Sequence, residues 1–182
     1  MRGFLKASFI GIIALAIAIT LFSLLIPSTV RVSRAVLINN TDSSAVFLAV
    51  THLQNWTKWH PVFTKEGAKL DCEMPAPKSA PDVCTIIQQD RRIDIKMHAP
   101  HEGIVPFTLK TEGENEVKSE IFISQESRGA PVFVEWMSLT TLKWYPWSKV
   151  QGIFLDKLTG PGYEAALKGL KEYIENNSRR SL

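Results

Sequence analysis

The sequence predicts an α+β fold, in which an antiparallel sheet carries helices on one face and follows an N-terminal apolar helix. Three observations lead to this prediction. Residues 68–142 contain short runs of alternating apolar and polar residues separated by turn residues, residues 147–174 carry apolar side chains at helical spacing, and residues 7–26 contain no charge. The short connections between the runs favour antiparallel pairing of neighbouring strands.

The first element is the uncharged run ASFIGIIALAIAITLFSLLI, from Ala7 to Ile26. As a helix it would be about 30 Å long, which matches the hydrocarbon core of a bilayer. A cleaved signal peptide is the alternative, but the run exceeds the usual apolar core of about 7–15 residues and no A-x-A-like site follows it. We therefore expect residues 1–26 to form a transmembrane anchor, which Pro27 ends.

The charges predict which partners the protein has and on which side of the membrane it lies. Arg2 and Lys6 precede the apolar run, and Arg31 and Arg34 follow it, so a weak positive-inside bias favours a domain on the extracytoplasmic side. Of the 21 basic residues, 19 remain after Arg2 and Lys6 are set aside, against 18 acidic residues. A nearly neutral domain has no electrostatic reason to bind nucleic acid. The predicted partner is a membrane.

The region after Pro27 predicts the order strand, helix, sheet and long helix. Alternation marks a strand over residues 30–38, and helical spacing marks a helix over residues 43–54. The strands predicted to follow are 68–74, 83–90, 92–98, 107–111, 117–125 and 131–142. The final helix carries two apolar stripes, one over residues 147–158 and one over residues 163–174, with an interruption at Gly160–Pro161–Gly162. The glycines of this helix are expected to let it bend.

Cys72 and Cys84 flank the proline-rich segment MPAPKSAPDV at the inner ends of two adjacent predicted strands. In an oxidising compartment they could face each other across a hairpin and form a disulfide worth about 3 kcal/mol. Two unrelated buried thiols are the alternative. A metal site is not expected, because C-x-x-C and a nearby histidine pair are both absent from the sequence.

Three stretches resemble the SRPBCC, or START-like, superfamily, and in particular its membrane-anchored polyketide cyclase/dehydrase-like proteins. They are the strand PSTVRVSRAVLI over residues 27–38, the motif LQNWTKWHP over residues 53–61, and PWSKVQGIFLDKLTGPGYEAALKGLKEYIE from Pro146 onwards. The Cys-flanked loop and the HAPHEG stretch differ from the family's pattern. The resemblance implies a helix-grip fold over residues 27–176, in which a curved antiparallel sheet of about six to seven strands wraps on the C-terminal helix. Residues 177–182 are expected to be a frayed tail.

By the same resemblance, the protein is expected to enclose a hydrophobic small molecule or lipid between the sheet and the final helix. No cofactor, metal or catalytic residue is predicted. Aromatic residues are the informative class, because five tryptophans are many for 182 residues and large rings line apolar pockets as well as cores. The candidate cavity residues are Trp59, His60, Phe107, Phe122, Trp136, Ser138, Thr140, Trp144, Phe154 and Leu158.

Two other functions remain open at this point. A cyclase or dehydratase would use the same cavity and would need polar acid–base groups inside it, for which His60 is the best single candidate. A protein-interaction module would instead present an exposed apolar groove. The fold alone does not choose among these three functions.

Overall fold

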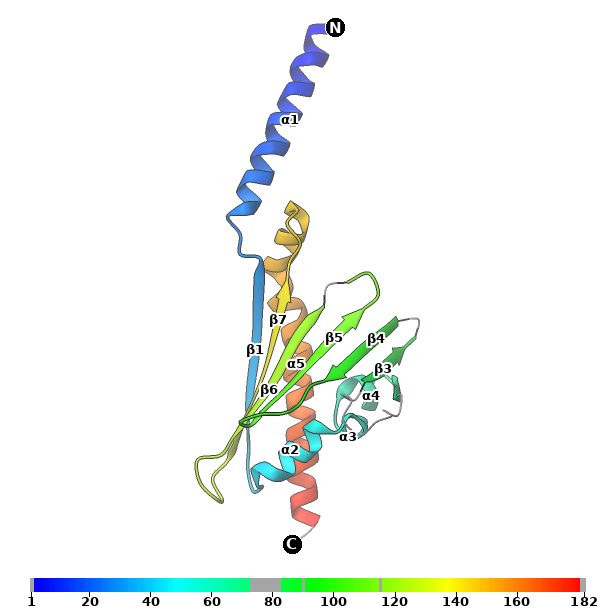
Figure 1. The fold of residues 1–182 in the computed structure, drawn as a ribbon, viewed down its shortest axis with the longest axis vertical. Coiled ribbons are helices and arrows are strands. Elements are labelled where there is room, and N and C mark those ends of the chain that lie inside the picture. The colour runs from blue at the N-terminus through cyan, green and yellow to red at the C-terminus, as the bar shows by residue number, and fades with distance from the viewer. Residues whose placement is uncertain (1, 73–82, 90, 115, 181–182) are drawn as a thin grey trace.

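Figure 1 shows the fold of the computed structural model, which describes residues 2–72, 83–89, 91–114 and 116–180, with side chains from residue 8 to residue 179. In chain order the elements are α1 (Arg2–Leu24), β1 (Thr29–Ile38), α2 (Ser43–Thr51), α3 (Leu53–Trp56), α4 (Pro61–Thr64), β2 (Lys69–Cys72), β3 (Val83–Gln88), β4 (Arg91–Met97), β5 (Ile104–Thr111), β6 (Val117–Ser124), β7 (Val132–Thr141) and α5 (Pro146–Arg180).

Seven strands form one antiparallel sheet in the order β1-β7-β6-β5-β4-β3-β2. From β2 to β7 each strand pairs with its neighbour in sequence, because short connections return the chain beside itself. The first strand instead pairs with the last, in a register that runs from Thr29 opposite Thr141 to Ile38 opposite Val132. The predicted α+β architecture and the predicted sheet of six to seven strands are both confirmed.

The inner face of the sheet is apolar because side chains on a strand alternate between its two faces. On β7 the inward residues Val132, Val134, Trp136 and Ser138 are buried, and the residues between them are partly exposed. Apolar side chains of α2, α3 and the second half of α5 join them in one core. The helices α2, α3 and α4 lie at one end of the sheet, beside the C-terminal half of α5 (Figure 1).

Several predicted boundaries shift by a few residues. The strand predicted over 107–111 begins at Ile104, because residues 104–106 already pair with β6 and the Pro106 carbonyl accepts from the His98 N–H. The helix predicted over 43–54 ends at Thr51, where α3 follows after one residue. The strand ends predicted at residues 74 and 90 lie outside the described residues.

The final helix is a single element, so the predicted interruption at residues 160–162 is wrong. Pro161 lies inside α5 on its exposed side, where water can replace the backbone hydrogen bond that proline removes. Beyond Pro161 the helix is held by apolar side chains that are buried against the core. It continues to Arg180, past residue 176, where the domain was predicted to end.

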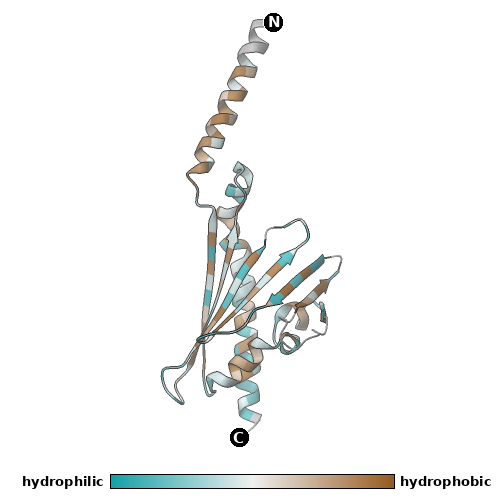
Figure 2. Ribbon diagram, viewed as in Figure 1, coloured by the Kyte–Doolittle hydropathy of each residue, from teal (hydrophilic) through white to brown (hydrophobic). Residues whose placement is uncertain are grey.

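Helix α1 leaves the domain (Figure 1), and Figure 2 colours most of its length as hydrophobic. Its described apolar side chains are largely exposed. For example, Phe9 is 65% exposed and Leu24 is 62% exposed. Among the described residues, however, no helix combines the length and the apolar character that crossing a membrane requires. The predicted transmembrane anchor is therefore not supported.

Cys72 and Cys84 lie directly opposite each other on β2 and β3. They form a disulfide, with their Cα atoms 4.1 Å apart. The bond joins the short edge strand β2 to its neighbour. The proline-rich segment between the two cysteines lies mostly outside the described residues.

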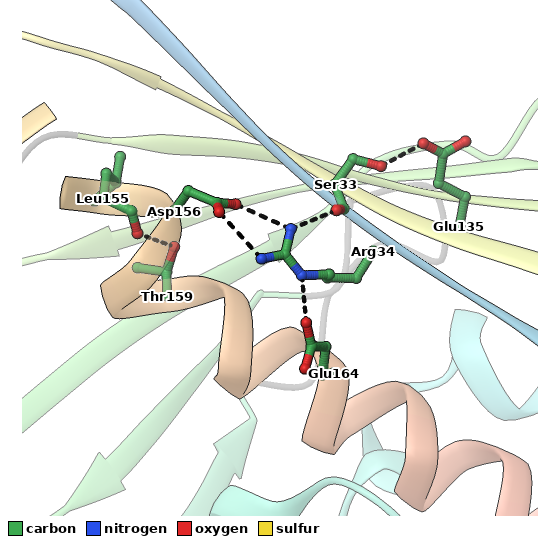
Figure 3. A network of polar contacts seen from close by, with 7 residues as sticks. All are labelled: Ser33, Arg34, Glu135, Leu155, Asp156, Thr159 and Glu164. Carbon is green, nitrogen blue, oxygen red and sulfur yellow. Dashed lines mark hydrogen bonds and ion pairs between the residues drawn. The ribbon is translucent and has the colours of Figure 1, made fainter. Parts of the chain in front are cut away.

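Arg34 joins the edge strand β1 to α5 (Figure 3). Its Nη1 and Nη2 donate to the two carboxylate oxygens of Asp156 over 2.9 and 3.2 Å, and its Nε donates to Glu164 over 2.6 Å. The hydrogen bond from Arg34 lowers the pKa of Asp156 below its ordinary value. The guanidinium lies against Gly160, where an added Cβ would stand 2.2 Å from Nη2. The glycine therefore makes room for Arg34, which is a different role from the predicted bending.

Gly160→Ala should destabilise the protein by displacing the Arg34 guanidinium from its two carboxylates. The displaced atoms belong to the end of a long side chain, so the loss should be modest. Thermal unfolding of Gly160→Ala, alone and combined with Arg34→Met, tests this explanation. The substitution should lower Tm in the wild-type background and have little effect once Arg34 is absent. An equal loss in both backgrounds would show that Gly160 serves another purpose.

Candidate functional site

Six ring-bearing residues meet between the sheet and the helices, and we call them the aromatic cluster: Trp56, Trp59, His60, Phe107, Trp136 and Tyr163. They come from α3 and the turn after it, from β5 and β7, and from α5. The motif LQNWTKWHP places three of them close together, because Trp56 ends α3 and Trp59 and His60 follow it in the turn that leads to α4. The third tryptophan of the cluster, Trp136, comes from the distant strand β7.

Trp136 is at the centre of this cluster. Its ring centroid lies 5.2 Å from Tyr163, 5.6 Å from Phe107, 5.6 Å from Trp56 and 5.8 Å from His60. Trp136 is only 2% exposed. At the level of Trp136, rings therefore fill the space between the sheet and α5.

The three buried indoles differ in their hydrogen bonds. The Trp56 Nε1–H donates to the Val50 carbonyl over 2.7 Å, and the Trp59 Nε1–H donates to the Ala49 carbonyl over 3.2 Å. Both acceptors lie in the last turns of α2, where helix carbonyls lack partners of their own. Trp136 Nε1 is buried with no hydrogen-bond partner in the described part of the chain. An unpaired buried donor costs about 1–3 kcal/mol, so this atom requires an explanation.

His60 has a structural role that the sequence analysis missed. Its Nδ1 accepts from the Val62 N–H over 3.3 Å, which caps the start of α4, and its ring stacks on Trp56. Burial lowers the pKa of His60 to about 4, so the ring is neutral at pH 7. Because Nδ1 accepts, we assign the proton of the neutral ring to Nε2.

The predicted polar groups Ser138 and Thr140 lie beyond Trp136 on the same face of β7. The Ser138 hydroxyl is buried and bonded to the Ser119 hydroxyl of β6 over 2.7 Å. This contact gives each of the two serine hydroxyls one hydrogen-bond partner. Thr140 is partly buried.

Four predicted cavity residues are exposed: Phe122 at 37%, Trp144 at 67%, Phe154 at 50% and Leu158 at 73%. Phe122 points outward because its neighbours Ile121 and Ile123 take the inward positions of β6. Trp144 follows the end of β7. Phe154 and Leu158 lie away from the side of α5 on which Gly160 meets Arg34. The structure therefore brings together Trp59, His60, Phe107 and Trp136 but not these four.

An open groove of about 670 Å³ lies outside the cluster, between the α3–α4 segment and the second half of α5. Trp59 is the predicted cavity residue that lines it, together with polar and charged residues such as Lys58, Lys65 and Glu172. At its floor Gly169 faces the Trp59 carbonyl, and a Cβ there would stand 2.2 Å from that oxygen. The sequence analysis missed Gly169; its small size within a helical pattern was the available signal.

The residues that the structure describes contain no group of three histidine, cysteine, aspartate or glutamate side chains placed to hold a metal ion. His60 is the titratable side chain of the aromatic cluster with a shifted pKa. The aromatic cluster therefore offers buried apolar surface around one neutral hydrogen-bond donor, the Trp136 Nε1–H.

Comparison with known proteins gives the fold. No family model matches the sequence, and no curated protein matches it. A START superfamily protein from Mycobacterium smegmatis aligns with a TM-score of 0.64 at 16% identity over 81% of this chain and 98% of its own. The Zhui aromatase/cyclase from a Streptomyces species aligns with a TM-score of 0.62 at 8% identity, over 81% of this chain and 94% of its own. The chain therefore has a START-like fold, in which a long C-terminal helix packs on an antiparallel sheet.

Proposed function

We propose that the protein binds a hydrophobic molecule that carries a hydrogen-bond acceptor, such as a lipid or a fatty acid, between β6, β7 and α5. The observation that carries the proposal is the Nε1–H of Trp136, which is buried and has no hydrogen-bond partner among the described residues. Binding sites for hydrophobic ligands combine an apolar lining with a few polar groups that fix the ligand's orientation. An oxygen of the ligand would accept from Trp136.

The packing of the aromatic cluster restricts where such a ligand can lie. Rings surround Trp136 on the side of α3 and α4, so a ligand at the centre of the cluster would have to displace them. On the other side β7 continues to Ser138 and Thr140, and just beyond its end the Leu142 side chain meets Gly152 in the first half of α5. We place the ligand's apolar body over this part of the inner face, with Trp136 as its floor.

Photolabelling with a fatty acid that carries a diazirine tests the proposal on the full chain. We expect label on the peptide that contains Trp136, and competition by unlabelled palmitate. Trp136→Phe removes the donor and keeps a ring, so it should weaken binding by about 2–10-fold, which corresponds to one hydrogen bond of about 0.5–1.5 kcal/mol. Phe122→Leu is the control, because it removes a partly exposed ring from the outer face of β6, and it should not change the labelling of that peptide. Absence of label from the Trp136 peptide, or equal labelling of that peptide in both variants, would contradict the proposal.

We also propose that α1 attaches the domain to a membrane. The support is the uncharged run of residues 7–26, together with apolar side chains on α1 that remain exposed in the folded chain. The charge bias around α1 and the disulfide between Cys72 and Cys84 favour an extracytoplasmic location.

Alkaline extraction of membranes from cells that express the full chain tests the attachment. The protein should stay in the pellet, and Ile13→Lys with Ile17→Lys should release it, because charged side chains resist burial in hydrocarbon. Thiol alkylation of the native protein before reduction should leave both cysteines unmodified. Release of the wild-type chain by alkali would contradict membrane attachment, and alkylation of the native cysteines would contradict the extracytoplasmic side.

A further inference from the structure

Three aromatic residues and one valine surround the start of α5, and we call them the tryptophan collar: Trp144, Tyr145, Trp147 and Val150. Trp144 is 67% exposed, Trp147 is 66% exposed and Val150 is 50% exposed. Tyr145 joins the two indoles, with its ring centroid 6.3 Å from Trp144 and 4.8 Å from Trp147. Exposing this much aromatic surface to water is unfavourable unless a partner covers it.

The collar is held at the end of the domain from which α1 departs. Lys149 is buried and donates from Nζ to the Ile26 carbonyl over 3.0 Å and to the Ser28 hydroxyl over 2.7 Å. The Leu142 N–H also donates to the Ser28 carbonyl over 2.7 Å. These contacts fix the start of α5 to the segment that links α1 to β1, and Figure 1 shows the first turns of α5 beside the lower end of α1.

We propose that the tryptophan collar docks on the interface of the membrane that α1 enters. This inference rests on the proposed attachment by α1, whose lower end lies beside the first turns of α5 (Figure 1). Tryptophan and tyrosine favour the boundary between headgroups and acyl chains, because their rings are apolar with one polar edge.

The charges near the collar fit the same partner. Lys143 precedes the collar in the sequence, Lys157 follows it, and both side chains are exposed and so available to anionic headgroups. Asp156 is the acidic residue of this part of α5, and Arg34 neutralises it over 2.9 Å. Within the part of the chain that the structure describes, neither lysine forms an ion pair, so the surface presents aromatic rings and positive charge, a combination that suits a lipid interface.

The distribution of tryptophans allows a direct test. All five lie outside α1, so fluorescence does not report on α1 itself. Three are buried to 2–3% exposure, and two belong to the collar. The full chain is reconstituted in vesicles of phosphatidylcholine and phosphatidylglycerol, with or without bromine on the acyl chains, and co-sedimentation is measured together with quenching.

Brominated lipid should quench the fluorescence of the wild-type chain. Trp144→Phe with Trp147→Phe should remove more than half of that quenching, whereas the matched control Trp59→Phe should retain it. Co-sedimentation without quenching, or quenching that survives the double substitution, would overturn docking by the collar and leave attachment by α1 intact. Failure to co-sediment would overturn both.

Discussion

Gly169→Ala should lower the free energy of unfolding by about 2 kcal/mol and Tm by roughly 5 °C. The added Cβ would stand 2.2 Å from the Trp59 carbonyl oxygen and 3.9 Å from Pro61. The Trp59 carbonyl oxygen is a backbone atom of the turn that carries Trp59 and His60. It therefore cannot move away from the added Cβ without shifting the aromatic cluster. Alanine is the better helix former by about 1 kcal/mol, so a loss of stability would show that the steric conflict outweighs propensity.

Gly162→Ala provides the matched control for this prediction. Gly162 lies in the same helix, is exposed, and has nothing within 4 Å of its ideal Cβ position. We expect this substitution to stabilise the protein by about 0.5–1 kcal/mol through helix propensity alone. Urea denaturation of both variants separates the two effects. Equal changes in both variants would mean that α5 does not approach Trp59 as closely as the structure indicates.

Local patterns were sufficient to predict most of the sheet. Alternation predicted a strand over residues 131–142, and β7 spans Val132–Thr141, because only one face of an antiparallel strand joins the core. The tryptophans at positions 56 and 59 were recognised from one motif, although their contacts with Phe107 and Trp136 arise only once distant strands pair. The cluster therefore depends on long-range pairing that periodicity does not encode.

The first half of α5 shows why two of the candidate cavity residues, Phe154 and Leu158, lie outside the aromatic cluster. Its apolar stripe was expected to face the sheet, because apolar faces of helices normally do so. In the structure the buried side of this half carries Lys149, Gly152 and Gly160 instead. Their partners are a backbone carbonyl near residue 26, the side chain of Leu142 and the guanidinium of Arg34. These contacts form only after β1 and α5 come together in the folded chain, so the local sequence pattern gave no signal for them.

Lowering the pH from 6.5 to 4 should destabilise the protein by about 3 kcal/mol through His60 alone. In the folded protein burial lowers the pKa of His60 to about 4, against an ordinary value of 6.5 in the unfolded chain. Between these two values the unfolded state binds the proton and the folded state does not, so acid favours unfolding. The contribution to stability is complete above pH 6.5, and about 2 kcal/mol of it is lost by pH 5.

His60→Asn isolates this contribution from that of the carboxylates. Asparagine is a good N-cap and can still accept from the Val62 N–H, but it does not titrate. The variant will lose ring packing against Trp56 and be less stable at pH 7, yet its stability should change little between pH 6.5 and pH 5. His52→Asn alters an exposed histidine and should keep the wild-type slope. Urea denaturation at half-unit pH intervals measures how the free energy of unfolding changes with pH in the wild type and both variants. If His60→Asn keeps the wild-type pH dependence, His60 is not its source, which would show that His60 is accessible to solvent and that the aromatic cluster is open.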